Sequence, residues 1–375
     1  MDQNEKTAVT ENSLNCKSCG AVLRYEPGTE ELKCSHCGAS NQIIGSETSH
    51  DIESYNYDEF VDYIQSAPPV SGDLQAVSCK NCGSKTTLPK NVTADKCPFC
   101  SSPLIIELND TQDYVRPHYI LPFAVNQQTA TDNFKNWIKG LSFAPNDLAQ
   151  KISNSSKPPL DGVYLPFWSY DADAFTSYDG SRGEHYWETE TYVEEVDGEQ
   201  REMTREVMRT SWWPVSGTVQ NNFEDLLVPA SNSLPAEMLN KVGGWQFSTI
   251  VEYDERYISG FRAENYQLVP QNGLESAKKM MDAEIDGAIR DDIGGDEQQV
   301  YNSSTELSNV GIKYLLLPVW VTSYVYKGTV YQVTINASTG EVHGHRPYSA
   351  MKITVLVIAI IIILAILFFV FAGKG

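Results

Sequence analysis

The chain has 375 residues and a formal net charge of −21, from 28 Lys and Arg against 49 Asp and Glu. Its length allows two or three domains. Nucleic-acid-binding proteins usually present a basic face, so the acidic balance argues against that class without excluding a local basic patch. The 20 Tyr and seven Trp are too many for a disordered chain and predict a packed core between residues 112 and 348.

The first 15 residues are polar and acidic, and they predict a disordered tail. They contain no apolar stretch of the kind that a signal peptide needs. We therefore expect the main body of the protein to lie in the cytoplasm.

A four-cysteine pattern occurs twice, with two CxxC pairs separated by fourteen residues in each copy and the copies 63 residues apart. Each copy has the spacing of a zinc ribbon, in which four thiolates hold one tetrahedral Zn²⁺. Gly20 and Gly38 each follow a knuckle, where a left-handed backbone is often needed. We predict two structural zinc ions. Their ligands are Cys16, Cys19, Cys34, Cys37, Cys79, Cys82, Cys97 and Cys100.

Two other interpretations of the cysteines are weaker. Four disulfides would suit an exported domain, which the missing signal peptide disfavours. His36 lies inside a knuckle and could replace a thiolate, but four Cys are already present. Because four thiolates leave no open coordination position for water, we expect no zinc catalysis.

The segment between the ribbons is acidic and includes apolar residues at helical spacing over Tyr57–Ile64. We favour a short helix that packs on the body over a docking motif for a partner. After the second ribbon, Leu104–Ile106 has the composition of a strand. Thr131 is then predicted to cap a helix over Asp132–Lys139.

Two aromatic-rich strand segments, 163–173 and 314–324, share the phrase Leu-Pro, one apolar residue and Trp. The similarity indicates an internal duplication of an α+β unit, and the alternative is convergent strand composition. The Pro in each segment indicates a strand start or an edge strand.

Residues 185–212 predict a long, exposed hairpin with Asp197-Gly198 as its two-residue turn. Pairing outward from that turn places Glu194 opposite Arg201 and Glu190 opposite Arg205. Opposite charges facing each other across strands are a common way to set register on a solvated ribbon. The hairpin is either a partner-binding arm or a surface decoration.

Three features follow the hairpin. Ser233 is predicted to cap a short helix with Pro235 in its first turn. An amphipathic helix is expected over 273–289, and the acidic run 291–296 ends it. His343 and His345 lie on one side of a late strand, so they predict either a two-His metal site or an interfacial surface strand.

The run from Ile353 to Phe371 contains no charge, Pro or Gly. Lys352 and Lys374 bracket it with 21 residues between them. As a helix, 21 residues span roughly 31 Å, close to the hydrocarbon thickness of a bilayer. The sequence therefore predicts one transmembrane helix, over residues 353–372, that acts as a tail anchor.

The chain lacks a phosphate-binding GxxxxGK[ST] loop, GxGxxG, HExxH and GxSxG. With every cysteine assigned to zinc, we predict that the protein is not an enzyme. The rival function is a membrane-tethered zinc-ribbon protein that binds nucleic acid. Its best support is the basic set around the second ribbon, namely Lys80, Lys85, Lys90 and Lys96.

The two ribbons and the terminal helix occur together with the phrases LPFWSYDAD, ASNSLP, YDERYISGFRAENYQ, DIGGD, LLLPVW and INASTGEVHGHRPYS. In this combination the chain resembles, over nearly its whole length, the bacterial zinc-ribbon membrane proteins of the YdjG type. Such proteins are often labelled primosomal-helicase-like or TFIIB-type, but the nucleotide-binding motifs of a helicase are missing here. The resemblance implies an association with membrane-stress systems containing phage-shock protein A-like and SPFH-domain proteins. It supplies no site residues beyond the ribbon cysteines.

We thus expect an α+β protein with two N-terminal four-cysteine zinc ribbons, a mainly β body and one C-terminal transmembrane helix. We expect it to act as a tail-anchored scaffold that recruits protein partners at the cytoplasmic face. The expected segments are a tail (1–15), ribbon 1 (16–44), an acidic linker with a short helix (45–78), ribbon 2 (79–106), the body (107–348) with its charged hairpin (185–212), and the membrane helix (353–372).

Overall fold

The structure is a computed structural model that describes residues 16–21, 23–43, 52–66, 74–79, 83–89, 94–99, 103–105, 116–154, 160–196, 199–264 and 266–372. The predicted tail 1–15 lies outside these residues. The described chain is a mixed α+β protein, mainly sheet, with a cysteine cluster near its N-terminus and one apolar helix at its C-terminus.

The body is organised around an eleven-stranded sheet. Its two central strands, β10 (Asp161–Val196) and β14 (Glu297–Tyr326), pair antiparallel from Asp161↔Val321 to Gly183↔Glu297. The other strands are β4 (Tyr55–Asn56), β5 (Leu74–Ser78), β6 (Lys85–Pro89), β9 (Tyr119–Ile120), β11 (Glu199–Pro229), β12 (Val251–Glu252), β13 (Arg262–Glu264), β15 (Thr329–Asn336) and β16 (Val342–Gly344).

Two smaller sheets belong to the ribbons. The first contains β1 (Leu23–Tyr25), β2 (Glu31–Cys34) and β3 (Ser40–Gln42). The second pairs β7 (Ala94–Lys96) with β8 (Pro103–Ile105). Short strands therefore adjoin the cysteine knuckles.

Seven α-helices are described. They are α1 (Tyr57–Ser66), α2 (Gln127–Gly140), α3 (Leu148–Asn154), α4 (Ala236–Lys241), α5 (Glu255–Ile258), α6 (Pro270–Ile293) and α7 (Ala350–Ala372). Helix α1 packs on the body, as we favoured. Its Phe60 is buried and meets the rings of Trp168 and His118 edge-on, at centroid distances of 6.0 and 4.8 Å.

Both faces of the central strands are buried, which explains why their sequences are continuously apolar. Alternate residues of β10 enter two hydrophobic clusters, with Tyr164 and Trp168 in one and Leu165 and Phe167 in the other. The indole N–H of Trp168 donates to the carbonyl of Leu268 at 2.8 Å. This bond satisfies the polar atom that burial of a Trp would otherwise strand.

The two Leu-Pro phrases lie on neighbouring strands, with Leu165 opposite Leu317. An internal duplication stays a prediction, because this pairing alone does not establish it. The expectation that Pro166 and Pro318 mark strand starts or edges is wrong. Each Pro lies within a central strand, at a gap between two successive neighbours on one side. Pro318, for example, falls between the β14 residues that pair with β9 and those that pair with β15. A residue without an N–H fits there because no neighbouring strand needs its donor.

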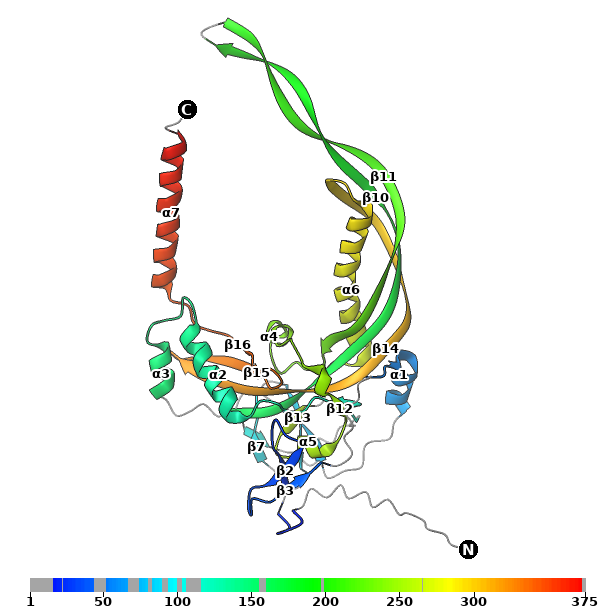
Figure 1. The fold of residues 1–375 in the computed structure, drawn as a ribbon, viewed down its shortest axis with the longest axis vertical. Helices are drawn as coiled ribbons and strands as arrows, with labels where there is room; N and C mark the ends of the chain where they lie inside the picture. Colours follow the sequence, from blue (N-terminus) through cyan, green and yellow to red (C-terminus); the bar gives the residue numbers. More distant parts are fainter. Residues whose placement is uncertain are drawn as a thin grey trace.

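The β10–β11 hairpin is far longer than the predicted 185–212. It pairs from Phe167↔Pro229 to Val196↔Glu199. Up to Gly183 it has β14 beside it, and α6 packs against this part with Leu274, Ala277, Met281 and Ile285. Beyond Gly183 the two strands continue alone as a twisted ribbon (Figure 1), here called the arm and defined as residues 183–196 and 199–212.

The predicted register of the arm is confirmed. Glu194 lies opposite Arg201 and Glu190 opposite Arg205. The Asp197-Gly198 turn itself lies outside the described residues.

Two predicted helix caps are wrong. Helix α2 begins at Gln127, where the side chain of Asn126 accepts from the N–H of Thr129. Thr131 lies inside this helix and donates to the carbonyl of Gln127. Before α4, Pro235 takes the cap position, because the hydroxyl of Ser233 is used by a buried carboxylate described below.

The amphipathic helix is confirmed as α6, which ends at Gly294 with a left-handed φ of 64°. The C-terminal run is helical as α7. Within the described chain it is the one helix long and apolar enough to cross a membrane, over Ala350–Phe368, and none of it is buried. It projects from the body on the same side as the arm (Figure 1).

Candidate functional site

The first cysteine set forms a compact cluster. The Sγ atoms of Cys16, Cys19, Cys34 and Cys37 all lie within 4.8 Å of one another. Cys16 is 3.6 Å from Cys37, and Cys19 is 3.6 Å from Cys34. A tetrahedral metal ion with bonds of ~2.3 Å would place its sulfurs about 3.8 Å apart, so the cluster has the dimensions of a metal centre and not of disulfides.

Each knuckle is a tight turn closed by backbone hydrogen bonds. The N–H of Gly20 donates to the carbonyl of Cys16 at 2.8 Å, and that of Gly38 to Cys34 at 2.9 Å. Both glycines are left-handed, with φ of 75° and 76°, and a Cβ on either would meet no atom within 4 Å. The requirement for glycine is therefore conformational and not steric, as the sequence predicted.

The environment of the thiols favours binding of a cation. The backbone N–H of Cys37, opposed by burial and assisted by the N–H of His36, lowers the pKa of Cys34 to about 6. The Ala21 N–H lowers the pKa of Cys19, but the thiols of Cys37 and Cys34 outweigh it and raise that pKa to about 12. Four adjacent thiols resist joint ionisation, and a bound metal ion would supply the charge that allows it.

Ribbon 1 is fastened to the body. The N–H of Tyr25 donates to the carbonyl of Ser259 at 2.9 Å, and the Ser259 hydroxyl donates back to the carbonyl of Leu23 at 2.5 Å. The ring of Tyr25 packs edge-on against Tyr257 at 5.0 Å. The cysteine cluster is thus held against the body by the strand that follows its first knuckle.

The second cysteine set is described in part. Cys79 and Cys97 are buried, and the N–H of Gly83 donates to the carbonyl of Cys79 at 2.8 Å, as in the first knuckle. Cys82 and Cys100 lie outside the described residues. This ribbon also joins the body, because β6 pairs with β13 in the main sheet.

A buried carboxylate lies where β6 meets the body. Glu264 is 1% exposed and accepts hydrogen bonds from Ser231 at 2.8 Å, from Gln267 Nε2 at 2.7 Å and from Ser233. Burial raises its pKa to about 8, although the two serine hydroxyls act in the opposite direction. Sequence reasoning missed this group, because its partners come from two separate segments that no local pattern connects.

The base of the arm carries another buried charge. Lys313 is 3% exposed, and its Nζ lies 2.5 Å from Asp225 Oδ1 and 3.1 Å from Asp171 Oδ2. These residues come from β14, β11 and β10. The ion pairs therefore tie the three strands together just where the sheet registers shift.

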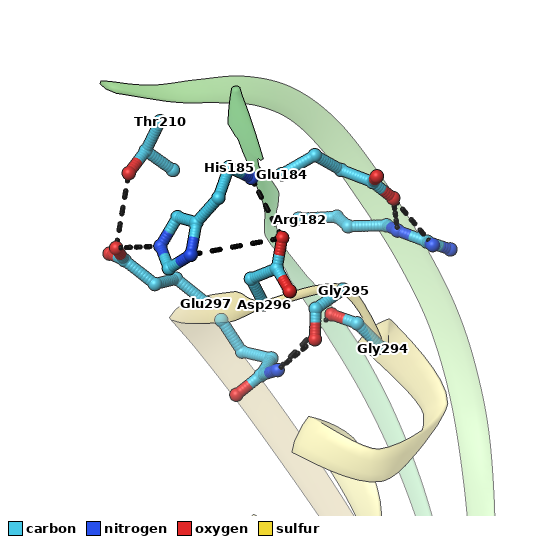
Figure 2. A network of polar contacts seen from close by, with 9 residues as sticks. Arg182, Glu184, His185, Thr210, Gly294, Gly295, Asp296 and Glu297 are labelled. Carbon is cyan, nitrogen blue, oxygen red and sulfur yellow. Dashed lines mark hydrogen bonds and ion pairs between the residues drawn. The ribbon is translucent and has the colours of Figure 1, made fainter. Parts of the chain in front are cut away.

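A clasp holds the arm where β14 leaves it (Figure 2). His185 Nε2 lies 2.8 Å from Glu297 Oε1, and the same carboxylate accepts from the Thr210 hydroxyl at 3.0 Å. The backbone N–H of His185 donates to Asp296 at 2.7 Å. The hydrogen bond to Glu297 raises the pKa of His185. The Gly-Gly-Asp end of the acidic run was predicted only to end α6, and its role in the clasp was missed.

The two faces of the arm differ. One face carries ion pairs, with Arg205 Nη2 at 2.8 Å from Glu190 and Arg209 against Glu188. By the alternation of strand side chains, Trp187, Met208 and Trp212 share the other face. Trp187 is 67% exposed and Met208 51% exposed. We call these three residues the apolar patch of the arm.

His343 and His345 lie beside β16 and line one cavity. His343 Nε2 is 3.2 Å from Glu341 Oε1. Among the residues that the structure describes, only the ribbon 1 cysteines bring three or more such ligand atoms close together. The predicted two-His metal site therefore gains no third ligand from this part of the chain.

The fold and the site together define a mainly β, mixed α+β protein with a four-cysteine centre and a terminal apolar helix. The chain is similar to a Bacillus subtilis (strain 168) protein described as "Uncharacterized protein YdjG". The two are 25% identical over 343 residues, which cover 91% of this chain and 92% of that protein. No family model matches the chain, and no solved structure matches it. The resemblance seen in the sequence thus extends over most of the chain, while that protein's description mentions neither zinc nor a membrane.

Proposed function

We propose that this protein is a non-enzymatic, membrane-anchored adaptor whose arm docks a protein partner. The observation that carries the proposal is the arm itself. It extends beyond its last pairing with β14, at Gly183↔Glu297, and presents the exposed apolar patch there. A chain that spends two strands on such a projection, with large side chains in solvent, has the features of an interaction surface.

In this proposal the ribbons are structural and hold one Zn²⁺ each. Four cysteines at ribbon spacing suit zinc, which takes four thiolates in a tetrahedron. The Sγ distances of ribbon 1 support an ion of this size. The matching first knuckle at Cys79 supports a second ion in ribbon 2.

Helix α7 is the proposed anchor, with the body in the cytoplasm. The arm is polar along much of its length and cannot lie in hydrocarbon, where each charge is costly. Because α7 and the arm project on the same side, insertion requires a change of direction between body and helix. The connection Arg346–Ser349 is the place for it, since α7 begins directly after it at Ala350.

The partner that we propose is a protein with an apolar, basic-rimmed surface. Trp187 and Met208 would supply the buried centre of the interface, and the acidic residues of the arm would face the basic rim. The resemblance to YdjG-type proteins favours a phage-shock protein A-like or SPFH-domain protein of a membrane-stress system as this partner.

The test is cross-linking of the full-length protein in its native membranes, followed by mass spectrometry. Two double variants separate the faces of the arm: Trp187→Ser with Met208→Ser removes the patch, and Glu190→Arg with Glu194→Arg reverses the charged face. We expect the first to lose the partner that the wild type captures, and the second to weaken the capture. A matched control, Tyr301→Ser, removes an exposed aromatic outside the arm. Undiminished capture by both arm variants would refute the adaptor role of the arm.

A further inference from the structure

A cavity of about 170 Å³ opens beside the base of α7. Its walls come from α2, α4 and the chain that runs from β16 toward α7. The residues that matter for its chemistry are Trp137, Met238, Lys241, His343, His345 and Arg346.

The cavity is cationic in a strongly acidic chain. Lys241 and Arg346 supply two permanent positive charges, and the two histidines add imidazole donors. The nearby carboxylate is that of Glu341, whose Oε1 lies 3.2 Å from His343 Nε2 and whose side chain is 59% exposed. One exposed acid beside two cations leaves a net positive wall, although the whole chain carries −21.

The cavity is close to the point where α7 leaves the body. The Ser349 N–H donates to the carbonyl of Phe143 at 2.7 Å, and Lys352 Nζ donates to that of Ala144 at 2.8 Å. These bonds fasten the loop after α2 to the base of α7. Arg346 lies only three residues before Ser349, so the cavity stays next to the membrane surface whichever direction the helix takes.

The exposed residues at this level are of the interfacial kind. The guanidinium of Arg346 lies over the ring of Tyr348, 5.2 Å from its centroid, and Tyr348 is exposed. Tyr and basic side chains are typical of the headgroup layer, where an aromatic ring and a charge are both satisfied.

We propose that this cavity binds the phosphate group of an anionic lipid headgroup. The proposal rests on the membrane anchoring proposed above. Arg346 would contact two phosphate oxygens through its planar fork, and Lys241 would act as a point charge. Trp137 and Met238 would contact the carbon atoms of the headgroup. Inorganic phosphate has the same charge chemistry and is the alternative source.

The experiment uses the full-length protein in micelles of an uncharged detergent. Dihexanoyl phosphatidylglycerol, dihexanoyl phosphatidylcholine and inorganic phosphate are titrated separately, and the dissociation constant is measured by thermophoresis. We expect saturable binding of phosphatidylglycerol and none of phosphatidylcholine. Lys241→Gln with Arg346→Gln should weaken binding by about tenfold or more. The matched control, Lys279→Gln with Lys327→Gln, removes two exposed lysines elsewhere and should bind like the wild type.

The outcomes separate the two proposals. Equal binding of inorganic phosphate and phosphatidylglycerol would assign the site to free phosphate and overturn the lipid. No saturable binding, or equal loss in the test and control variants, would overturn the site itself. A salt wash of membranes containing the same protein measures anchoring independently, because it does not depend on the cavity.

Discussion

Arg205 holds the carboxylate of Glu190 on the facing strand with two hydrogen bonds, from Nε at 3.0 Å and from Nη2 at 2.8 Å. Arg205 also lies over the ring of Tyr192, 5.3 Å from its centroid. Its hydrogen bonds lower the pKa of Glu190. Opposite charges therefore hold the register of the free arm where no third strand supports it.

Reversing this pair should not destabilise the fold. Both side chains are exposed, and solvent and salt screen such pairs strongly. We expect Arg205→Glu to leave the melting temperature of the full-length protein unchanged, as measured by circular dichroism in detergent. A clear drop in that temperature would show that the arm contributes to folding of the body.

Loss of the charge at the base of the arm should behave differently. Lys313→Met leaves Asp171 and Asp225 without their buried cation. We expect a cost of about 2–3 kcal/mol in the free energy of unfolding, below the range for fully buried pairs because Asp225 is half exposed. Urea denaturation measures it, with Lys279→Met on the exposed side of α6 as the control. Equal stability of the two variants would contradict this.

The buried Glu264 predicts a pH dependence. Its pKa is raised from an ordinary value of 4.5 to about 8, so between these values the folded chain binds more protons than the unfolded chain. The contribution of Glu264 to stability is therefore present at low pH and is lost as pH rises through this window.

Glu264→Gln removes that titration and keeps a group able to bond Ser231 and Ser233. The wild type minus variant difference in melting temperature should fall between pH 5 and pH 8. Ser276→Ala, on the exposed surface of α6, serves as the control for the pH series. A difference that does not vary with pH would mean that Glu264 is not protonated in the folded protein.

Removing one ribbon ligand should lower the zinc content by one ion per chain. In Cys16→Ser, mass spectrometry of the metal should give one Zn²⁺ where the wild type gives two. Because Tyr25 and Ser259 fasten ribbon 1 to the body, we also expect a lower melting temperature for the body. Ser35→Ala, within the second knuckle, is the control and should keep both ions. Loss of both ions from Cys16→Ser would show that the ribbons fold as one unit.

Deleting residues 353–375 should release a soluble, folded protein. The described part of α7 is exposed, and its links to the body are the few contacts at its base. Fractionation with a salt wash measures the release. Retention of the truncated protein on membranes would reveal a second attachment, for which the cavity at the base of α7 is the first candidate.

Local patterns in the sequence specified several elements well. The CxxC spacing placed the cluster of Cys16 and its partners, and the turn residues fixed the arm register from Glu190↔Arg205 to Val196↔Glu199. Both depend on nearby residues and simple geometry. The length of β10 was not evident, because bulges near Asp171 and Asp179 and the aromatic run look locally like separate strands.

Contacts between distant segments could not be predicted. Glu264 is bonded by Ser231 and Ser233, and the His185 clasp joins β10 to the chain after α6. Such networks depend on the sheet topology, which no single stretch of sequence carries. The misplaced caps at Thr131 and Ser233 have a related cause, since a hydroxyl residue before a helix often has a better partner elsewhere.

The continuity of β10 has a mechanical consequence. One strand runs from the middle of the body sheet to the end of the arm, and Gly183 to Val196 alone spans roughly 43 Å. Paired strands resist stretching but bend and twist readily, and α6 stiffens only the half nearest the body. The arm is therefore a spacer of fixed reach and variable angle. A partner gripped near its end could tilt or rotate freely, yet its distance from the body would be set by the number of residues in the strand.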